Sequence, residues 1–148
     1  MITTNLDAVL AYSNPLVIAR FKINHPAFSD KAERLFLNML KYLWLCNKYE
    51  QDISAHPERS DLAFIPVMHE EMRQIDNMWH EFILITRDYH DFCYQHFGKF
   101  LHHVPNMREE LKLSEEEFTE QLSLFLAYIY ETLGEETLTE WFSEHLTH

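Results

Sequence analysis

The chain contains very few residues that interrupt helices. Only Gly98 and Gly134 are glycines, and five of the 148 residues are prolines. Tight hairpins depend on glycine, proline and asparagine, so little room is left for a sheet built of hairpins. The chain is 47% hydrophobic and 14% aromatic, which is enough to build a packed core. We therefore predict an all-α fold in which residues 1–148 form a single compact bundle-like domain.

Helical spacing of hydrophobic residues predicts four or five helices, and one extended segment between them. The expected helices span residues 5–12, 30–49, 67–97, 115–133 and 138–146. Residues 16–21 fit either a short helix or an extended piece, and the polar residues 51–61 are expected to form a loop. Gly98 is the expected left-handed stop of the third helix, and residues 99–105 are predicted to be extended.

Two pairs of residues have the spacing of a capping box, in which a side chain at the start of a helix and one three residues later bond the free amides. Asp30 with Glu33 is expected to start the second helix, and Ser114 with Glu117 the fourth. Pro66 suits the first turn of the third helix, because the amide that proline lacks would have no partner there.

The negative charge is concentrated in the last third of the chain. Between Val104 and His148, eleven glutamates face only Arg108 and Lys112, so this part carries −9 of the net charge of −12. Such a surface repels phosphate, and nucleic acid and anionic membranes are therefore not expected as partners. Glu115, Glu116 and Glu117 also lie in the first turn of a predicted helix, where negative charge is favourable.

The residues with the most chemistry lie between Asp76 and Pro105. On the predicted helix 67–97 a core stripe is formed by Ile75, Met78, Trp79, Phe82, Thr86, Tyr89 and Cys93. Asp76 and His80 are four residues apart on one edge of this stripe, and His69 lies seven residues before Asp76 on the same edge. A carboxylate one turn from an imidazole can accept its N–H, as happens behind metal-bound histidines.

His102 and His103 follow in the extended segment, where consecutive side chains point to opposite faces. Only one of the two is therefore expected to meet His80. We expect Phe100 and His102 on the inward face, which makes His102 the first candidate and His103 the second.

These residues allow two interpretations. In the first, His80 and one of the histidine pair bind zinc or iron, and Asp76 or His69 completes the site. In the second, Asp76, His80 and His102 form a buried hydrogen-bonded cluster that ties the turn to the helix. No HExxH or CxxC motif is present to favour the metal.

The lopsided charge and the lack of a recognisable catalytic set favour an interaction module over an enzyme. Trp44, Tyr128 and Tyr130 fall off the main hydrophobic stripes and, with Glu115, Glu116 and Glu117, could form a surface for a protein partner. The same aromatic residues would be buried if most helix faces are covered. A metal-binding protein or metalloenzyme that uses His80 and His102 or His103 is the alternative function.

The cysteines indicate a reducing compartment. Cys46 and Cys93 both fall among hydrophobic residues, where a thiol is usually inert packing. The first residues have no basic region before a hydrophobic run, and no run is long enough for a membrane span. A cytoplasmic protein is therefore expected.

The run Asp76, Trp79-His80, Phe82-Ile83-Leu84, Thr86, Tyr89, Phe92-Cys93, Gly98, Phe100, His102-His103 and Pro105 resembles small uncharacterised bacterial proteins. It is also similar, more distantly, to a domain of the plant glycine-rich domain-containing proteins, in which an aspartate precedes a Trp-His pair. The resemblance covers about thirty residues, and the glycine-rich region of the plant proteins is absent here. It implies a helical domain with a specific site at these residues, but no reaction.

Overall fold

The computed structural model describes residues 4–103 and 113–143, and this part of the chain is helical, without a strand. It contains seven α-helices, more than the four or five expected, and three short 3₁₀ helices. The α-helices are α1 (Leu6–Leu10), α2 (Pro15–Asn24), α3 (Ala32–Ala55), α4 (Arg73–Leu84), α5 (Thr86–Phe97), α6 (Glu115–Leu133) and α7 (Glu135–Trp141). The 3₁₀ helices are η1 (Pro26–Lys31), η2 (Ser60–Leu62) and η3 (Glu70–Met72).

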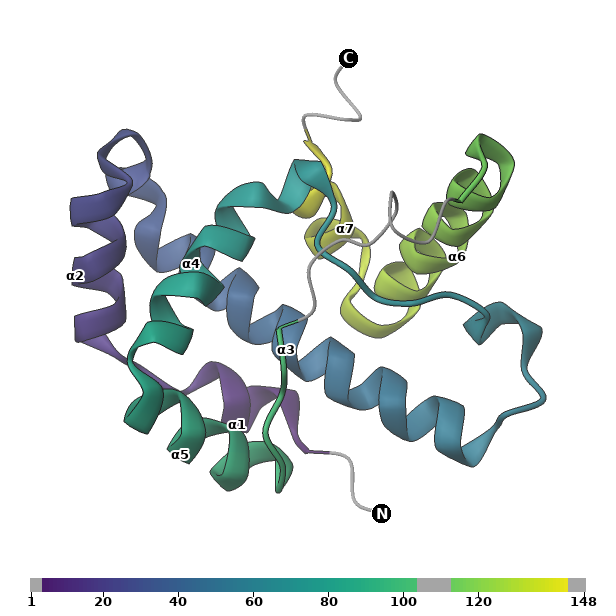
Figure 1. Cartoon of the computed structure of the whole chain (residues 1–148), viewed down its shortest axis with the longest axis horizontal. Coiled ribbons are helices and arrows are strands. Elements are labelled where there is room, and N and C mark those ends of the chain that lie inside the picture. The colour runs from purple at the N-terminus through teal and green to yellow at the C-terminus, as the bar shows by residue number, and fades with distance from the viewer. Residues whose placement is uncertain (1–3, 104–112, 144–148) are drawn as a thin grey trace.

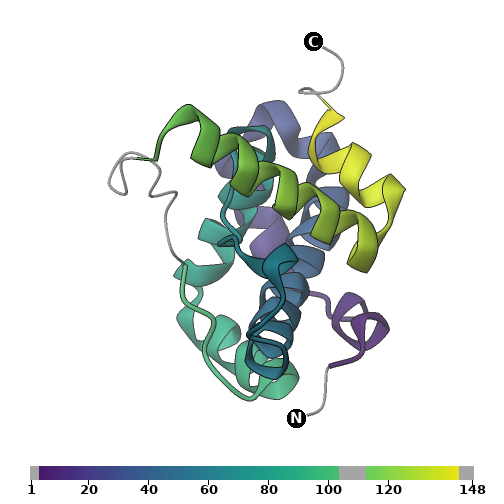
Figure 2. The same ribbon diagram turned by 90° about the vertical axis from the view of Figure 1, so that its right-hand side faces the viewer.

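The longest helix, α3, runs diagonally through the middle of the molecule (Figure 1). It contacts α1, α2, α4 and α6. In Figure 1, α1, α2, α4 and α5 lie on the left of the view, and α6 and α7 on the upper right. Figure 2 shows α6 crossing α3, so the C-terminal pair of helices covers a face of α3 that the N-terminal helices leave open.

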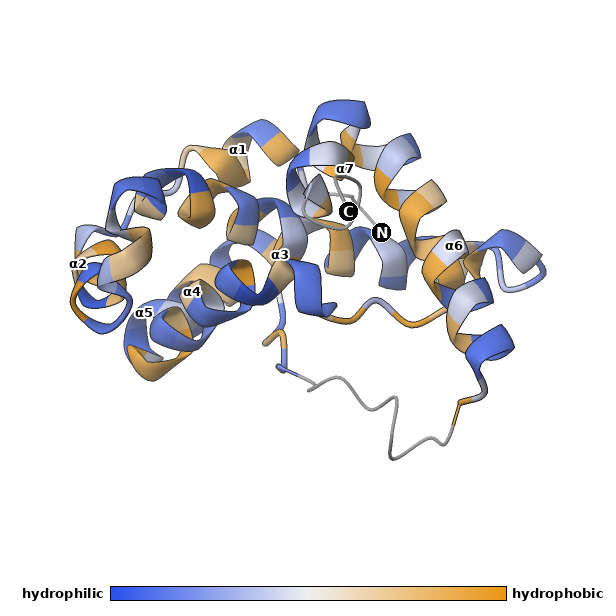
Figure 3. Ribbon diagram, turned by 90° about the horizontal axis from the view of Figure 1, so that it is seen from above, coloured by the Kyte–Doolittle hydropathy of each residue, from blue (hydrophilic) through white to orange (hydrophobic). Residues whose placement is uncertain are grey.

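The helices share one hydrophobic core. Its most buried large side chains come from α2, α3, α4, α5, α6 and the end of α7, and include Phe21, Leu43, Phe82, Phe92, Phe125 and Trp141. Figure 3 shows hydrophobic and hydrophilic residues alternating around the helices, as expected where each helix buries one face. No helix in the described ranges has both the length and the hydrophobicity to cross a membrane.

Of the two alternatives for residues 16–21, the helical one applies, because Pro15 begins α2 and the Asn14 side chain accepts a hydrogen bond from the amide of Val17. The region around α3 differs from the prediction at both ends of the helix. Asp30 is not the cap of α3. It lies inside η1, and α3 begins at Ala32 without a capping side chain. The helix also continues to Ala55, so part of the expected loop 51–61 is helical.

The predicted helix 67–97 is two helices preceded by an extended stretch. Residues 65–69 are not helical, and η3 begins only at Glu70. Ile65 precedes Pro66, and the residue before a proline disfavours helical geometry. The helix then breaks at Ile85, whose φ of −91° and ψ of 74° are not helical. Ile83, Ile85 and Thr86 are β-branched, which weakens the helix at this point. Gly98 does end α5 in a left-handed conformation, as predicted.

The capping box of Ser114 and Glu117 is confirmed at the start of α6. The last helix begins earlier than expected, at Glu135, and α7 extends to Trp141. It is fastened to α3, because Arg34 forms two hydrogen bonds of 2.6 Å with Glu140 and Trp141 Nε1 donates to Asn38 Oδ1. Pro105 and the predicted last residues of this helix, 144–146, lie outside the described ranges.

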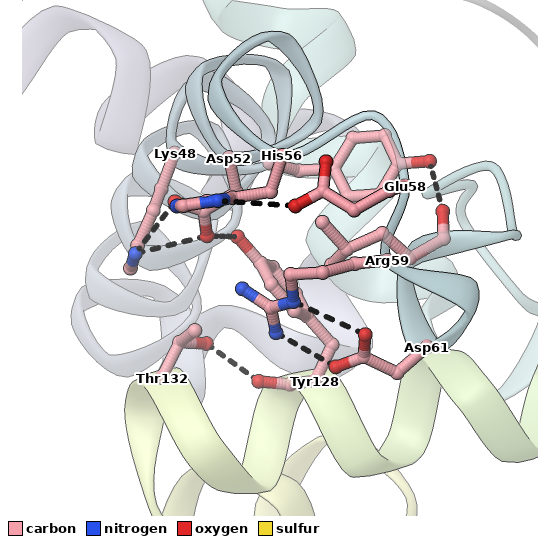
Figure 4. A network of polar contacts seen from close by, with 10 residues as sticks. Lys48, Asp52, His56, Glu58, Arg59, Asp61, Tyr128 and Thr132 are labelled. Atoms are coloured by element: carbon pink, nitrogen blue, oxygen red, sulfur yellow. Dashed lines mark hydrogen bonds and ion pairs between the residues drawn. The ribbon is translucent and has the colours of Figure 1, made fainter.

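A polar network ties the C-terminal end of α3 to α6 (Figure 4). The Tyr128 hydroxyl donates to Asp52 Oδ2 over 2.7 Å, and Lys48 pairs with the same carboxylate. Arg59 and Asp61 form a bidentate pair in the connection that follows α3. These contacts fix the chain just before the extended residues that lead to α4.

Candidate metal centre

Three potential metal ligands converge at the surface of α4. Asp76 and His80 lie one turn apart on this helix, and His103 approaches them from the segment after α5. His103 Nε2 is 2.6 Å from Asp76 Oδ1 and 3.0 Å from His80 Nε2, and His80 Nε2 is 3.5 Å from Asp76 Oδ1. The side chain of His80 is 50% exposed, that of Asp76 25% and that of His103 18%. The triad thus has a sheltered side and an open side.

The left-handed turn at Gly98 sends the chain back along α5 toward α4. Gly98 has a φ of 71°, and its amide bonds the carbonyl of Tyr94. We call residues 99–103 the return segment. Leu101 in this segment is buried against the core, whereas His102 is exposed.

Trp79 and Tyr89 hold the return segment in place. Trp79 Nε1 donates to the Tyr89 hydroxyl over 3.0 Å, and that hydroxyl donates to the carbonyl oxygen of Leu101. The indole ring of Trp79 also packs against His103, with ring centroids 4.4 Å apart. Two residues of the core stripe therefore determine where the imidazole of His103 lies.

The model of one protein family, described as UCP032817-like, matches residues 9–128. The chain belongs to the UCP032817-like family. No curated protein and no solved structure matches it. The match to this family includes all three residues of the site, but its description names no activity. The similarity to the plant glycine-rich domain-containing proteins stays a prediction.

In this UCP032817-like chain it is His103, the second candidate, that meets His80. The expected alternation holds from Leu101 to His103, but it is shifted by one residue: Leu101 and His103 point inward and His102 is exposed, while Phe100 is half-buried against Tyr89. A shift of one residue in an extended segment exchanges the two faces. Tyr89 decides the shift by bonding the carbonyl of Leu101. His102 instead packs against Phe100, with ring centroids 4.8 Å apart.

His69 is not brought to the triad. The prediction assumed that His69 and Asp76 share one helix, but α4 begins only at Arg73. His69 is buried among Phe118, Phe125 and Phe142. Burial there lowers the pKa of its imidazole, an effect that the nearby Glu71 partly opposes.

The other residues of the predicted stripe are mostly where they were expected. Ile75, Met78, Trp79, Phe82, Tyr89 and Cys93 are buried. Burial raises the pKa of the Cys93 thiol, as expected for an inert cysteine in the core. Thr86 is exposed, contrary to the prediction, and lies at the first position of α5 after the break at Ile85.

The residues proposed as a partner surface do not gather on one. Trp44 is 7% exposed, and its Nε1 donates to the carbonyl of Thr4. Tyr128 is 4% exposed and belongs to the network of Figure 4. Tyr130 and the glutamates Glu115, Glu116 and Glu117 are exposed. The alternative of burial in a small bundle is therefore the one that applies to Trp44 and Tyr128.

Sequence reasoning missed Glu81, the residue after His80. Its carboxylate is buried on the opposite edge of α4 and binds Arg20 Nε over 3.2 Å and Asn24 Nδ2 over 3.0 Å. His25 Nε2 is 3.9 Å from Glu81 Oε2. A buried carboxylate surrounded by donors is a stabilising contact between α2 and α4. No spacing in the sequence signals it, because its partners are about sixty residues away.

The triad has the composition of an open metal site. A carboxylate only accepts hydrogen bonds, so His103 Nε2 carries the proton that it donates to Asp76 when no metal is bound. If that proton moves to Nδ1 of His103, the Nε2 atoms of His80 and His103 and Asp76 Oδ1 can bind the same ion. Two histidines and one carboxylate bind ferrous iron in many oxygenases, and three protein ligands with an open position bind catalytic zinc.

Proposed function

We propose that this protein binds a divalent transition metal ion, zinc or ferrous iron, through Asp76, His80 and His103. The observation that carries the proposal is the convergence of three ligand atoms from two segments separated by α5. They are 2.6, 3.0 and 3.5 Å apart. In tetrahedral zinc sites ligand atoms lie roughly 3.3 Å apart, as follows from a Zn–N distance of about 2.0 Å. Small movements of the side chains would complete the site.

The half-exposed side of the triad supports a site with an open coordination position. His80 stands at the solvent side, so water or a further ligand can reach the ion there. Structural zinc sites are closed by four protein ligands, whereas catalytic sites keep one position for water or substrate. The described residues supply three protein ligands, which is the number that an open site of this kind requires.

The alternative is that the triad is only a hydrogen-bonded cluster that ties the return segment to α4. His103 and Asp76 alone could perform that role, because they are in direct contact and are the more sheltered pair. His80 is half exposed and stands at the edge. Replacement of His80 therefore distinguishes metal binding from a purely structural cluster of hydrogen bonds.

For His80→Ala in protein purified without a histidine tag, we expect about a hundredfold loss of zinc or ferrous iron affinity. The free energy of unfolding without metal should change by less than about 0.5 kcal/mol, because Asp76 keeps His103 as its partner. Isothermal titration calorimetry and urea denaturation measure the two quantities. His102→Ala is the matched control and should change neither.

Elemental analysis gives the stoichiometry, for which we expect one equivalent per chain. Less than one equivalent of any transition metal, with no rise in melting temperature on adding zinc or ferrous iron, would overturn the proposal. A loss of about 1–3 kcal/mol of stability in metal-free His80→Ala would instead support a hydrogen-bonded cluster in which His80 is a necessary member.

The interaction module remains a second proposal with less support. The exposed acidic first turn of α6 and Tyr130 are compatible with a basic protein partner. Two of the three aromatic residues that were to anchor such a partner are buried, however, and this removes most of the argument.

A further inference from the structure

Trp79 takes part in a second feature besides the triad. While its ring packs on His103, it also lines a cavity of about 300 Å³. His102, which does not reach the triad, lines this cavity. The two consecutive histidines of the return segment thus belong to different sites: His103 belongs to the triad, and His102 lines the cavity.

Besides Trp79 of α4, three parts of the chain that are distant in sequence line the cavity. One face of α3 contributes Tyr42, Cys46 and Tyr49, the extended stretch before α4 contributes Ile65, and the return segment contributes Phe100. Most of this lining is hydrophobic or aromatic. A concave site of this size and composition is typical of pockets for small molecules, at the lower end of their range.

Tyr42 and Cys46 give the cavity one polar position. Tyr42 is only 2% exposed, and its hydroxyl donates to the sulfur of Cys46 one turn further along α3. Burial raises the pKa of both groups, that of Cys46 to about 12, so both stay uncharged. Sulfur is a weak acceptor, and an oxygen atom in the cavity would accept a stronger hydrogen bond from this hydroxyl.

The charged groups of the cavity already neutralise each other. Of its lining residues only Glu50 and Lys99 carry a permanent charge, and they form an ion pair. A charged ligand would have to leave water without gaining a free partner, which is unfavourable. The occupant that fits is therefore uncharged.

We propose that this cavity binds a small uncharged molecule with a hydrophobic ring and one acceptor oxygen, which takes the hydrogen bond of Tyr42. The proposal goes beyond metal binding and does not depend on it, because none of Asp76, His80 and His103 lines the cavity. Trp79 would contact the ligand on one side and His103 on another, so the two sites share a wall.

Three probes of similar shape test the class of ligand. Acetophenone has the ring and the oxygen, α-methylstyrene replaces that oxygen by a carbon, and benzoate adds a charge. We expect acetophenone to bind most tightly and to shift the indole N–H resonance of Trp79 in ¹H–¹⁵N spectra, with that resonance assigned from Trp79→Phe. Benzoate should not saturate the site in the same range of concentration.

Substitution of Tyr42 tests the hydrogen bond. In Tyr42→Phe, acetophenone should bind about five- to tenfold more weakly, while α-methylstyrene should bind as before. Tyr130→Phe, which changes an exposed tyrosine away from the cavity, is the control and should bind both probes as the parent does. His80→Ala should also bind acetophenone normally, which separates this site from the metal centre.

The proposal is wrong if none of the three probes shifts Trp79, or if the shifts fall on residues away from the cavity. It is also wrong if benzoate binds as tightly as acetophenone, or if Tyr42→Phe weakens the two uncharged probes equally. If the protein binds acetophenone but no metal, the proposed function is wrong and the proposal for the cavity stands.

Discussion

Tyr89 is the residue on which the candidate metal centre most depends, although it is not a ligand. Its hydroxyl accepts from Trp79 Nε1 and donates to the carbonyl of Leu101, so it joins α4, α5 and the return segment at one atom. Both of its partners are buried. The imidazole of His103 is two residues from Leu101 and follows its position.

We therefore expect Tyr89→Phe to destabilise the fold by about 1–3 kcal/mol, because two buried polar groups lose their partner. Metal affinity should fall about tenfold, as it does when supporting residues behind a ligand are removed. Urea denaturation and calorimetry measure the two effects, with Tyr130→Phe as the control. A variant with unchanged metal affinity would show that the return segment keeps its position without this hydroxyl.

At the scale of the element, the ends of the helices decide which residues meet. The break at Ile85 turns the chain between α4 and α5, and Gly98 turns it again after α5. Without the second turn the return segment could not come back to Asp76 and His80. A Cβ added at Gly98 would meet no atom within 4 Å, so only the backbone conformation requires glycine there.

Gly98→Ala should accordingly cost about 1–2 kcal/mol, because an alanine in the left-handed region brings its Cβ close to the carbonyl oxygen. Gly98→Asn is the matched variant and should cost less, since asparagine adopts this conformation more readily. Chemical denaturation measures both. Equal losses in the two variants would mean that contacts of the side chain, and not the φ of 71°, determine the cost.

At the scale of the whole molecule, α3 organises the fold, and α6 and α7 close it. Between the C-terminal helices and the rest of the core lies His69, whose ring stacks on Phe125 at a centroid distance of 5.4 Å. This imidazole is buried and its pKa is lowered. We therefore expect acid to weaken the attachment of α6 and α7.

The sign of the effect follows from the unfolded chain, in which the histidine takes up a proton near pH 6.5, whereas in the folded state it does so only at lower pH. The contribution of His69 to the free energy of unfolding should therefore be fully present above pH 6.5. It should fall as the pH drops from 6.5 toward the lowered pKa, by at most about 1.4 kcal/mol per pH unit.

In His69→Phe this contribution should disappear. The difference in free energy of unfolding between parent and variant, measured by urea denaturation from pH 5 to 8, should thus depend on pH below 6.5 and be constant above. A difference that stays constant throughout would show that His69 does not titrate in this range. His96, whose pKa is also lowered by burial, is present in both proteins and cancels.

The sequence by itself determined the helical class, the stop at Gly98, the capping box at Ser114 and the approach of a histidine to Asp76 and His80, because these depend on spacing along the chain and on the conformations of single residues. Only the tertiary structure decided that this histidine is His103, since the register of the return segment is set by the hydrogen bond from Tyr89 to Leu101. It also decided the burial of Trp44, Tyr128 and Glu81, whose partners are distant in sequence. Contacts between residues that are far apart along the chain leave no periodic pattern in it, and such contacts placed the site.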